Sequence, residues 1–216
     1  MSESVFLNPQ ARDWVFTPSD NDTTPLVLAF HKTLPGYNQT RLHALPDVAQ
    51  ELGLGHVFLK DESDRFGLPS FKILGASWAV YRAVCAHLGV DATTSLAELG
   101  RRAAGLRLAT ATAGNWGRAV ARMAGYLGLE VTVFVTDLMV EYTREKIRSE
   151  GAEVRPVPGD YDDSLEAARR FADETGALLV VDTSWEGFET IPLVGFPVPG
   201  SSRVNIVQGD RLIGSS

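Results

Sequence analysis

The chain has 216 residues, of which 44% are hydrophobic and 22% charged, so it holds enough apolar material for the core of an ordinary globular protein. Its net charge of -7 and the absence of a basic stripe exclude nucleic acid as an expected partner, because an acidic surface repels phosphates. The single cysteine, Cys85, excludes an internal disulfide. With no signal-peptide pattern and no apolar run of membrane-spanning length, we expect a cytoplasmic protein without membrane contact.

The first part of the chain predicts few regular elements. Prolines punctuate residues 1–55 and exclude long helices across those points. A short helix is expected at 46–52 and a strand at 56–62. A helix follows from Ser70, a suitable N-cap, to about residue 88, with Gly89 as its stop. One face of this helix is apolar, and its residues are Phe71, Leu74, Trp78 and Tyr81.

Strands and helices then alternate, which is typical of βαβ units and a parallel sheet. The expected strands lie at 105–112, 130–136, 153–158 and 177–183, and the helices at 95–104, 118–128, 140–151 and 161–176. Asp163 and Glu166 resemble a capping box in the last helix. The predicted fold class is therefore α/β, with an open parallel sheet, flanking helices and a ligand site at the carboxyl edge of the strands.

Lys72 is unusual among the lysines Lys32, Lys60, Lys72 and Lys146, because no charged residue lies within six positions of it. It stands in the first turn of an apolar helix, where the helix dipole and burial both disfavour the ammonium form. The neutral amine is the form that attacks a carbonyl. The alternative is a structural lysine whose stem covers apolar surface.

A second candidate site is TATAGNWGR (110–118), between a predicted strand and a predicted helix. Gly114 and Gly117 let the backbone bend, and the free amides of the following helix can bind an anion such as a carboxylate. Asn115 adds a neutral donor. The alternative is an ordinary strand–helix turn.

Together the two segments resemble a known family. KDESDRFGLPSFKILGA (60–76), TATAGNWGRAVA (110–121) and the stretch from 140 to about 192 are similar to the tryptophan-synthase-β-like (fold type II) enzymes that use pyridoxal 5'-phosphate (PLP). The similarity is greatest to their diaminopropionate ammonia-lyase branch. It implies α,β-elimination on a small amino acid, with 2,3-diaminopropionate giving pyruvate and ammonia.

The resemblance also implies residue roles. Lys72 matches the lysine that binds PLP covalently, and Asn115 matches the asparagine that hydrogen-bonds the ring hydroxyl oxygen. The positions of Thr112, Ala113 and Gly114 match the loop that binds the substrate carboxylate. Asp182 matches a proton-abstracting aspartate. Two departures leave the substrate and its stereochemistry open: Ala113 replaces an acid of the branch, and Trp116 replaces a histidine and is expected to add bulk near the site.

The family's large domain is formed by both ends of its chains. The resemblance therefore implies three parts: an incomplete large-domain segment at 1–84, a small α/β domain at 85–190, and a divergent, loop-like tail at 191–216 with at most one short strand. A glycine-rich phosphate loop and a partner for the pyridine nitrogen are not visible. We therefore expect a C-terminally truncated chain, with impaired catalysis and an exposed apolar face on the helix that starts at Ser70.

Three functions stay open. The first is a PLP-dependent lyase, which would form a homodimer if the large domain were complete. The second is an inactive fragment or pseudoenzyme that acts at most as a binding partner. The third is a nucleotide-binding module, which the lack of G-x-G-x-x-G disfavours. The scattered histidines give no metal-ligand spacing.

Overall fold

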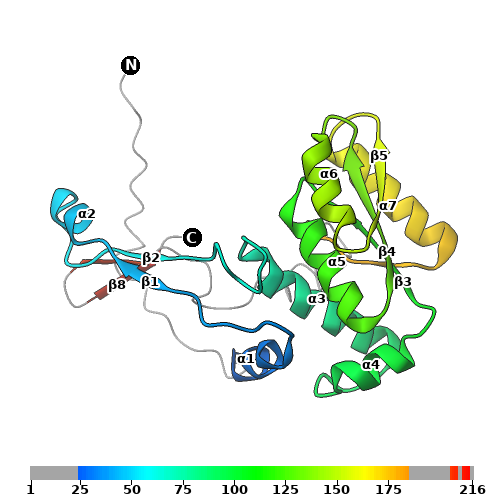
Figure 1. Cartoon of the computed structure of the whole chain (residues 1–216), viewed down its shortest axis with the longest axis horizontal. Helices are drawn as coiled ribbons and strands as arrows, with labels where there is room; N and C mark the ends of the chain where they lie inside the picture. Colours follow the sequence, from blue (N-terminus) through cyan, green and yellow to red (C-terminus); the bar gives the residue numbers. More distant parts are fainter. Residues whose placement is uncertain (1–23, 185–204, 209–210, 215–216) are drawn as a thin grey trace.

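A four-stranded parallel sheet organises the compact part at the right of Figure 1 in the computed structural model, which describes residues 24–184, 205–208 and 211–214. Its strands are β3 (Arg107–Ala111), β4 (Glu130–Thr136), β5 (Glu153–Val157) and β6 (Leu178–Leu179). Their spatial order is β5-β4-β3-β6, and every neighbouring pair is parallel. The predicted α/β class with an open parallel sheet is thus confirmed. Strand order reverses between β3 and β6, the position where open parallel sheets bind ligands.

Helices cover both faces of this sheet (Figure 1). On one side lie α5 (Asn115–Leu127) and α6 (Glu141–Arg148), and on the other lies α7 (Tyr161–Thr175). Because both faces are buried, β4 is apolar almost throughout: Val133 joins the core under α5, and Phe134 joins the core under α7. The capping box of α7 is formed by Asp160 and Asp163, so the expected pair Asp163 and Glu166 was wrong.

A further helical layer packs on α5. It consists of α3 (Lys72–Leu88) and α4 (Leu96–Arg102). α3 ends at Gly89 in the left-handed conformation, as predicted, whereas its N-cap is Phe71 rather than Ser70. α3 also runs through the expected domain boundary at 84 without a break. The helix that begins at Lys72 therefore extends from the segment expected in the large domain into the one expected in the small domain.

The apolar face of α3 is buried, contrary to expectation. Leu74, Trp78 and Tyr81 are between 2% and 6% exposed, and only Phe71 is exposed. Phe30 of α1 (Thr24–Thr33) covers them, with its ring centroid 5.1 Å from that of Trp78. α1 was not predicted, because the prolines around it suggested irregular chain. Pro25 fits its first turn, where a missing N–H costs nothing.

Two small two-stranded sheets complete the described structure. β1 (Leu42–Ala44), which was not predicted, pairs antiparallel with β2 (Phe58–Lys60), and α2 (Pro46–Glu51) connects them close to its expected position. β7 (Asn205–Gln208) and β8 (Arg211–Gly214) also form an antiparallel pair. The prediction of a loop-like tail with at most one short strand was therefore wrong for these residues.

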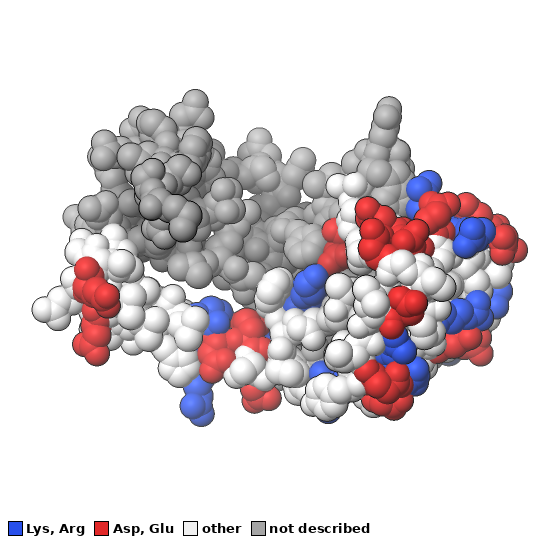
Figure 2. All heavy atoms as spheres, turned by 90° about the horizontal axis from the view of Figure 1, so that it is seen from above, with Lys and Arg blue, Asp and Glu red and all other residues white. Residues whose placement is uncertain are grey.

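The surface fits the charge pattern of the sequence. On the face seen in Figure 2, acidic and basic side chains are mixed, and no continuous basic area is visible on the coloured residues. Within the ranges that the structure describes, no helix combines the length and the apolar character needed to cross a membrane.

Candidate active site

A cavity of about 480 Å³ lies where β3 and β6 end, at the reversal of strand order. Its volume falls within the usual range for small-molecule sites. The six residues singled out from the sequence all line it, although they come from three separate segments. The full lining is Lys72, Thr112, Ala113, Gly114, Asn115, Trp116, Tyr161, Asp182 and Thr183.

Lys72 and Asp182 form an ion pair in this cavity. Lys72 Nζ donates to Asp182 Oδ2 at 2.8 Å, and the two side chains are 33% and 15% exposed. Ser70 fixes the start of α3, because its hydroxyl accepts the Lys72 N–H at 3.2 Å. The argument for an isolated amine therefore does not hold, since a carboxylate 110 residues away in sequence is its partner. A lysine that merely covers apolar surface would not make this contact.

The loop after β3 is shaped by one hydroxyl. Thr112 Oγ1 accepts the N–H groups of Gly114 and Gly117 at 2.9 and 3.0 Å, and Thr112 is 2% exposed. Gly117 is needed for close packing: a Cβ there would lie 2.4 Å from Thr112 Cγ2 and 2.9 Å from Val133 Cγ1. The first turn of α5 is thereby packed closely against the loop after β3, with Asn115 and Trp116 at the cavity.

Asn115 and Ala113 are the exposed residues of this loop. Asn115 is the first residue of α5, at the positive end of the helix dipole. Its side-chain amide has no hydrogen bond within the described part of the chain, so it is available to a ligand. A helix N-terminus with a neutral amide donor suits an anionic or oxygen-rich ligand.

Trp116 lines the cavity, as expected of a bulky residue near the site, but most of its side chain is buried. It is 1% exposed, and its Nε1 donates to Thr110 Oγ1 at 3.2 Å and to the Val180 carbonyl oxygen at 3.4 Å. The indole N–H is therefore directed at β3 and the residue after β6, and the side chain forms part of the cavity wall.

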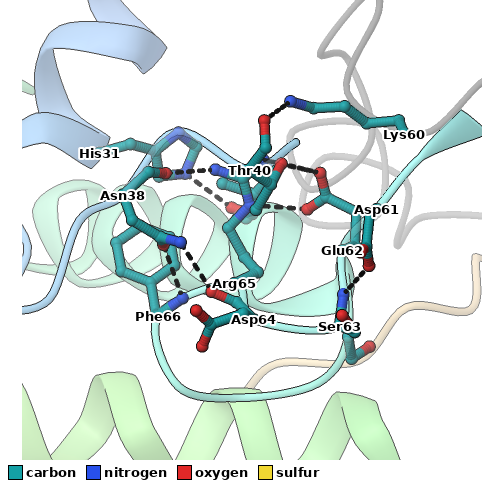
Figure 3. Close-up of polar contacts among 12 residues, drawn as sticks. His31, Asn38, Thr40, Lys60, Asp61, Glu62, Ser63, Asp64, Arg65 and Phe66 are labelled. Atoms are coloured by element: carbon teal, nitrogen blue, oxygen red, sulfur yellow. Dashed lines mark hydrogen bonds and ion pairs between the residues drawn. The ribbon is translucent and has the colours of Figure 1, made fainter. Parts of the chain in front are cut away.

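A polar network holds the segment that leads to Lys72 (Figure 3). Arg65, which is 6% exposed, donates to both oxygens of Glu62, to the Asn38 carbonyl oxygen and to Thr40 Oγ1, at 2.6–2.9 Å. The next residue, Phe66, donates its N–H to Asn38 Oδ1 at 3.1 Å. These bonds fix the turn before α3, so the direction in which Lys72 leaves it is set by side chains outside the cavity.

A second network joins the same turn to α5. Arg122 Nη1 donates to the Phe66 carbonyl oxygen at 3.0 Å, and the same guanidinium pairs with Glu150. Arg118, one turn earlier on α5, also donates to Glu150, at 3.0 Å. Burial alone would raise the pKa of Glu150, but hydrogen bonds from Arg122 and Arg118 outweigh it and bring that pKa below its usual value.

Two lining residues were missed by the sequence analysis. Tyr161 is the first residue of α7, and its hydroxyl is hydrogen bonded to Thr183 Oγ1 at 3.1 Å. Thr183 directly follows Asp182. The position of Thr183 next to a candidate base was a signal in the sequence. Nothing in the pattern of α7 pointed to Tyr161, because only the packing of α7 on the sheet brings it to the cavity.

The cavity at the strand ends, with its paired lysine and its helix N-terminus, defines a small-molecule enzyme site in an α/β protein. A family model described as "Pyridoxal-phosphate dependent enzyme" matches residues 33–193, and the chain belongs to this family. PLP is the cofactor of the family. The resemblance found from Lys72 and the asparagine loop is thereby confirmed.

The similar proteins include ammonia-lyases. Diaminopropionate ammonia-lyase of Salmonella typhimurium is 42% identical over 172 residues, and that of Escherichia coli K12 is 36% identical over 169 residues. Each match covers 77% of this chain, but only 43% and 42% of the relative, so the chain spans less than half the length of these curated relatives. The Escherichia coli enzyme in complex with D-serine superposes with a TM-score of 0.75 at 34% identity, covering 82% of this chain and 47% of that one.

The residues present fit PLP at its aldehyde end. The cofactor needs a primary amine for its aldehyde, and Lys72 places one inside the cavity. Its ring oxygen needs a hydrogen-bond donor, and Asn115 lines the same cavity with an amide that has no bond to another described residue. Lys72 and Asn115 are therefore the two side chains that would hold this end of the cofactor.

Proposed function

We propose that this chain carries the lysine-bearing part of a PLP-dependent ammonia-lyase. Its reaction would be α,β-elimination on a small amino acid that carries an amino or hydroxyl group on Cβ. The observation that carries the proposal is the Lys72–Asp182 pair, with Nζ 2.8 Å from Oδ2, in a cavity at the strand-order reversal. An amine and a carboxylate at this distance are the groups that cofactor attachment and proton transfer at Cα require.

When bound, the cofactor supplies the electron sink for charge that develops at the substrate Cα. The chain's own residues supply position and proton transfer. Lys72 binds the aldehyde, Asn115 donates to the ring oxygen, and the amides at the start of α5 hold the substrate carboxylate. Because the Thr112 hydroxyl is used within the loop, Thr112 contributes by shaping that loop, and Ala113 and Gly114 contribute backbone and space.

Asp182 is the group proposed to take the proton from Cα. Its side chain is 15% exposed and lies beside the Lys72 nitrogen, so a proton can pass between the two. With 2,3-diaminopropionate, loss of the Cα proton and of the Cβ amino group, followed by hydrolysis, gives pyruvate and two molecules of ammonia. Serine or D-serine would lose hydroxide from Cβ as water and give the same 2-oxo acid with one ammonia.

The domain assignment stays a prediction under this proposal. Residues 1–84 would belong to a large domain and 85–190 to a small one. A chain with a complete large domain would form a homodimer. Residues 1–23 and 185–204 lie outside the described ranges, and with them the Trp-Glu-Gly part of the resemblance after Ser184.

Cofactor capture tests the proposal first. The purified chain is mixed with PLP, reduced with borohydride and mapped by peptide mass. A label on Lys72 alone supports an organised site, whereas a label spread equally over Lys32, Lys60 and Lys146 contradicts it. Turnover is then measured as ammonia and 2-oxo acid, which is pyruvate from 2,3-diaminopropionate and serine and 2-oxobutyrate from threonine. Lys72→Ala should abolish it and Lys146→Ala should not; a labelled chain without turnover would favour the binding-only alternative.

A further inference from the structure

Tyr161 connects two elements at the wall of the cavity. It is the first residue of α7, which packs on the face of the sheet opposite α5. Its hydroxyl oxygen lies 3.1 Å from Thr183 Oγ1, in the segment that follows β6. Tyr161, Asp182 and Thr183 all line the cavity. The start of α7 is thus tied to the segment that carries the candidate base.

This contact is not needed to begin α7. The capping box of Asp160 and Asp163 already does so: Asp160 Oδ1 accepts the N–H of Asp162 at 2.9 Å, and Asp163 Oδ2 accepts the Asp160 N–H at 2.9 Å. The Tyr161 hydroxyl can therefore be removed without taking away a helix cap.

The segment that holds Asp182, in contrast, has little support from the sheet. β6 has only two residues, Leu178 and Leu179, and the bond of the Val180 N–H to the Ala109 carbonyl oxygen at 2.9 Å is the last main-chain link to β3. Within the described ranges, no backbone–backbone hydrogen bond holds Asp182 or Thr183. Val180 and Val181 are anchored by burial, and beyond them the side-chain contacts of Asp182 and Thr183 hold the Asp182 carboxylate in place.

We infer that Tyr161 is a positioning residue for Asp182: its hydroxyl ties the Asp182–Thr183 segment to α7 and keeps the Asp182 carboxylate against Lys72 Nζ. The inference rests on the proposed function only for the catalytic role of Asp182. The arrangement itself concerns residues of the chain and can be measured without cofactor.

The protonation state of Tyr161 fits this role. Burial raises the pKa of its hydroxyl above the usual value, and the charge of Asp182 raises it further, against an opposing effect of the Thr183 hydrogen bond. The phenol therefore stays neutral throughout the physiological range and keeps a proton for hydrogen bonding. A tyrosinate beside Asp182 would repel the carboxylate from its place.

The test measures how strongly Asp182 protects the Lys72 amine in the cofactor-free chain. A trace of acetic anhydride acetylates the lysines, and peptide masses give the rate at Lys72 relative to the exposed Lys32. Asp182→Asn sets the upper limit of the ratio, because it removes the paired charge. Tyr161→Phe should raise the ratio about threefold, the effect of losing roughly 0.6 kcal/mol of one hydrogen bond.

The matched variants separate position from folding. Thr183→Val should act like Tyr161→Phe, the double variant should add nothing further, and Thr183→Ser should behave like the wild type. Tyr142→Phe, on an exposed tyrosine of α6, should leave the ratio unchanged. Cys85 is 2% exposed, so it should not react with a thiol reagent in a folded chain. This lack of reaction is the check that each variant is folded.

A wild-type ratio in Tyr161→Phe, alongside a raised ratio in Asp182→Asn, would overturn the inference. So would an additive double variant, because the two hydroxyls would then act independently. If Asp182→Asn itself left the ratio unchanged, the ion pair would be absent and the inference would fall with it. Failure of PLP to label Lys72 would instead reject the proposed function.

Discussion

Arg122 on α5 donates from Nη1 to the main-chain oxygen of Phe66 at 3.0 Å. Phe66 lies in the turn that leads to Lys72, and α5 begins at Asn115, so one guanidinium joins the two segments that carry the candidate cofactor-binding side chains. Phe66 has a φ of 55°, a conformation that costs a residue with a side chain about 1–3 kcal/mol and persists only when its surroundings hold it.

Replacing Arg122 should therefore destabilise the fold and loosen the site. Arg122→Gln leaves Glu150, whose side chain is 6% exposed, with Arg118 as its one cationic partner among the described residues. We expect a loss of about 1–3 kcal/mol, less than for a buried charge left with no partner. Urea unfolding measures it. Arg101→Gln, which removes a 76% exposed partner of Glu98, is the control and should cost at most about 1 kcal/mol. Equal losses would show that the α5–Phe66 link contributes nothing.

Gly117 tests the close packing of α5 on the strand ends. In Gly117→Ala the new Cβ would meet Thr112 Cγ2 at 2.4 Å, so the loop must shift and stability should fall by about 1–3 kcal/mol. Adding Thr112→Ser removes that methyl group and keeps the hydroxyl, so part of the loss should return. Thermal unfolding and PLP labelling of Lys72 are the measurements.

The control for this prediction lies on the same helix. Gly125→Ala meets nothing within 4 Å and should stabilise the chain by about 0.5–1 kcal/mol through helix propensity. A Gly117→Ala chain as stable as Gly125→Ala would contradict the packing described for the loop.

His31 predicts a specific pH dependence of stability. Burial lowers its pKa from 6.5 to about 4, and its Nε2–H donates to the Leu74 carbonyl oxygen at 2.9 Å. Between pH 6.5 and about 4, His31 binds a proton in the unfolded chain but not in the folded one. The free energy of unfolding is therefore highest above pH 6.5 and falls by roughly 3 kcal/mol in total as the pH falls towards 4.

Urea unfolding between pH 7 and 4 measures this loss. His31→Gln removes the titrating group and should flatten the pH dependence, while His87→Gln, on an exposed histidine at the end of α3, should keep it. An unchanged slope in His31→Gln would assign the acid sensitivity to other groups.

Ala113 predicts which stereoisomer the site accepts. It is exposed at the cavity, where the diaminopropionate ammonia-lyase branch carries an acid, so among the described residues this position offers no carboxylate for proton transfer. If Asp182 is the base for one stereoisomer, that isomer alone should turn over. Ala113→Asp should then raise the rate of turnover of the other isomer by about 100-fold, which is the size of effect typical of a positioned acid or base. Separate assays of D- and L-2,3-diaminopropionate decide it, with Ala113→Asn as the uncharged control.

Local sequence features determined much of the fold. The pattern EVTVFVT predicted β4 with its observed bounds, because a strand buried on both faces must be apolar nearly throughout. Gly89 ended α3 as predicted, because a left-handed residue there favours glycine. α1 was missed because its prolines read as breakers, although Pro25 fits the first turn. The three-residue strand β1 is too short to show a period.

The candidate site divides in the same way. Lys72 and the loop with Asn115 could be singled out from the sequence, because their residue types and positions are local properties of the chain. Asp182 was named only through the resemblance to the family. That Lys72 is paired with Asp182, that the Trp116 indole bonds to Thr110, and that Tyr161 reaches Thr183 were decided by the tertiary structure alone. Each of these depends on how α3, α5 and α7 pack around β3 and β6, and such packing joins residues whose separation in sequence carries no signal of contact.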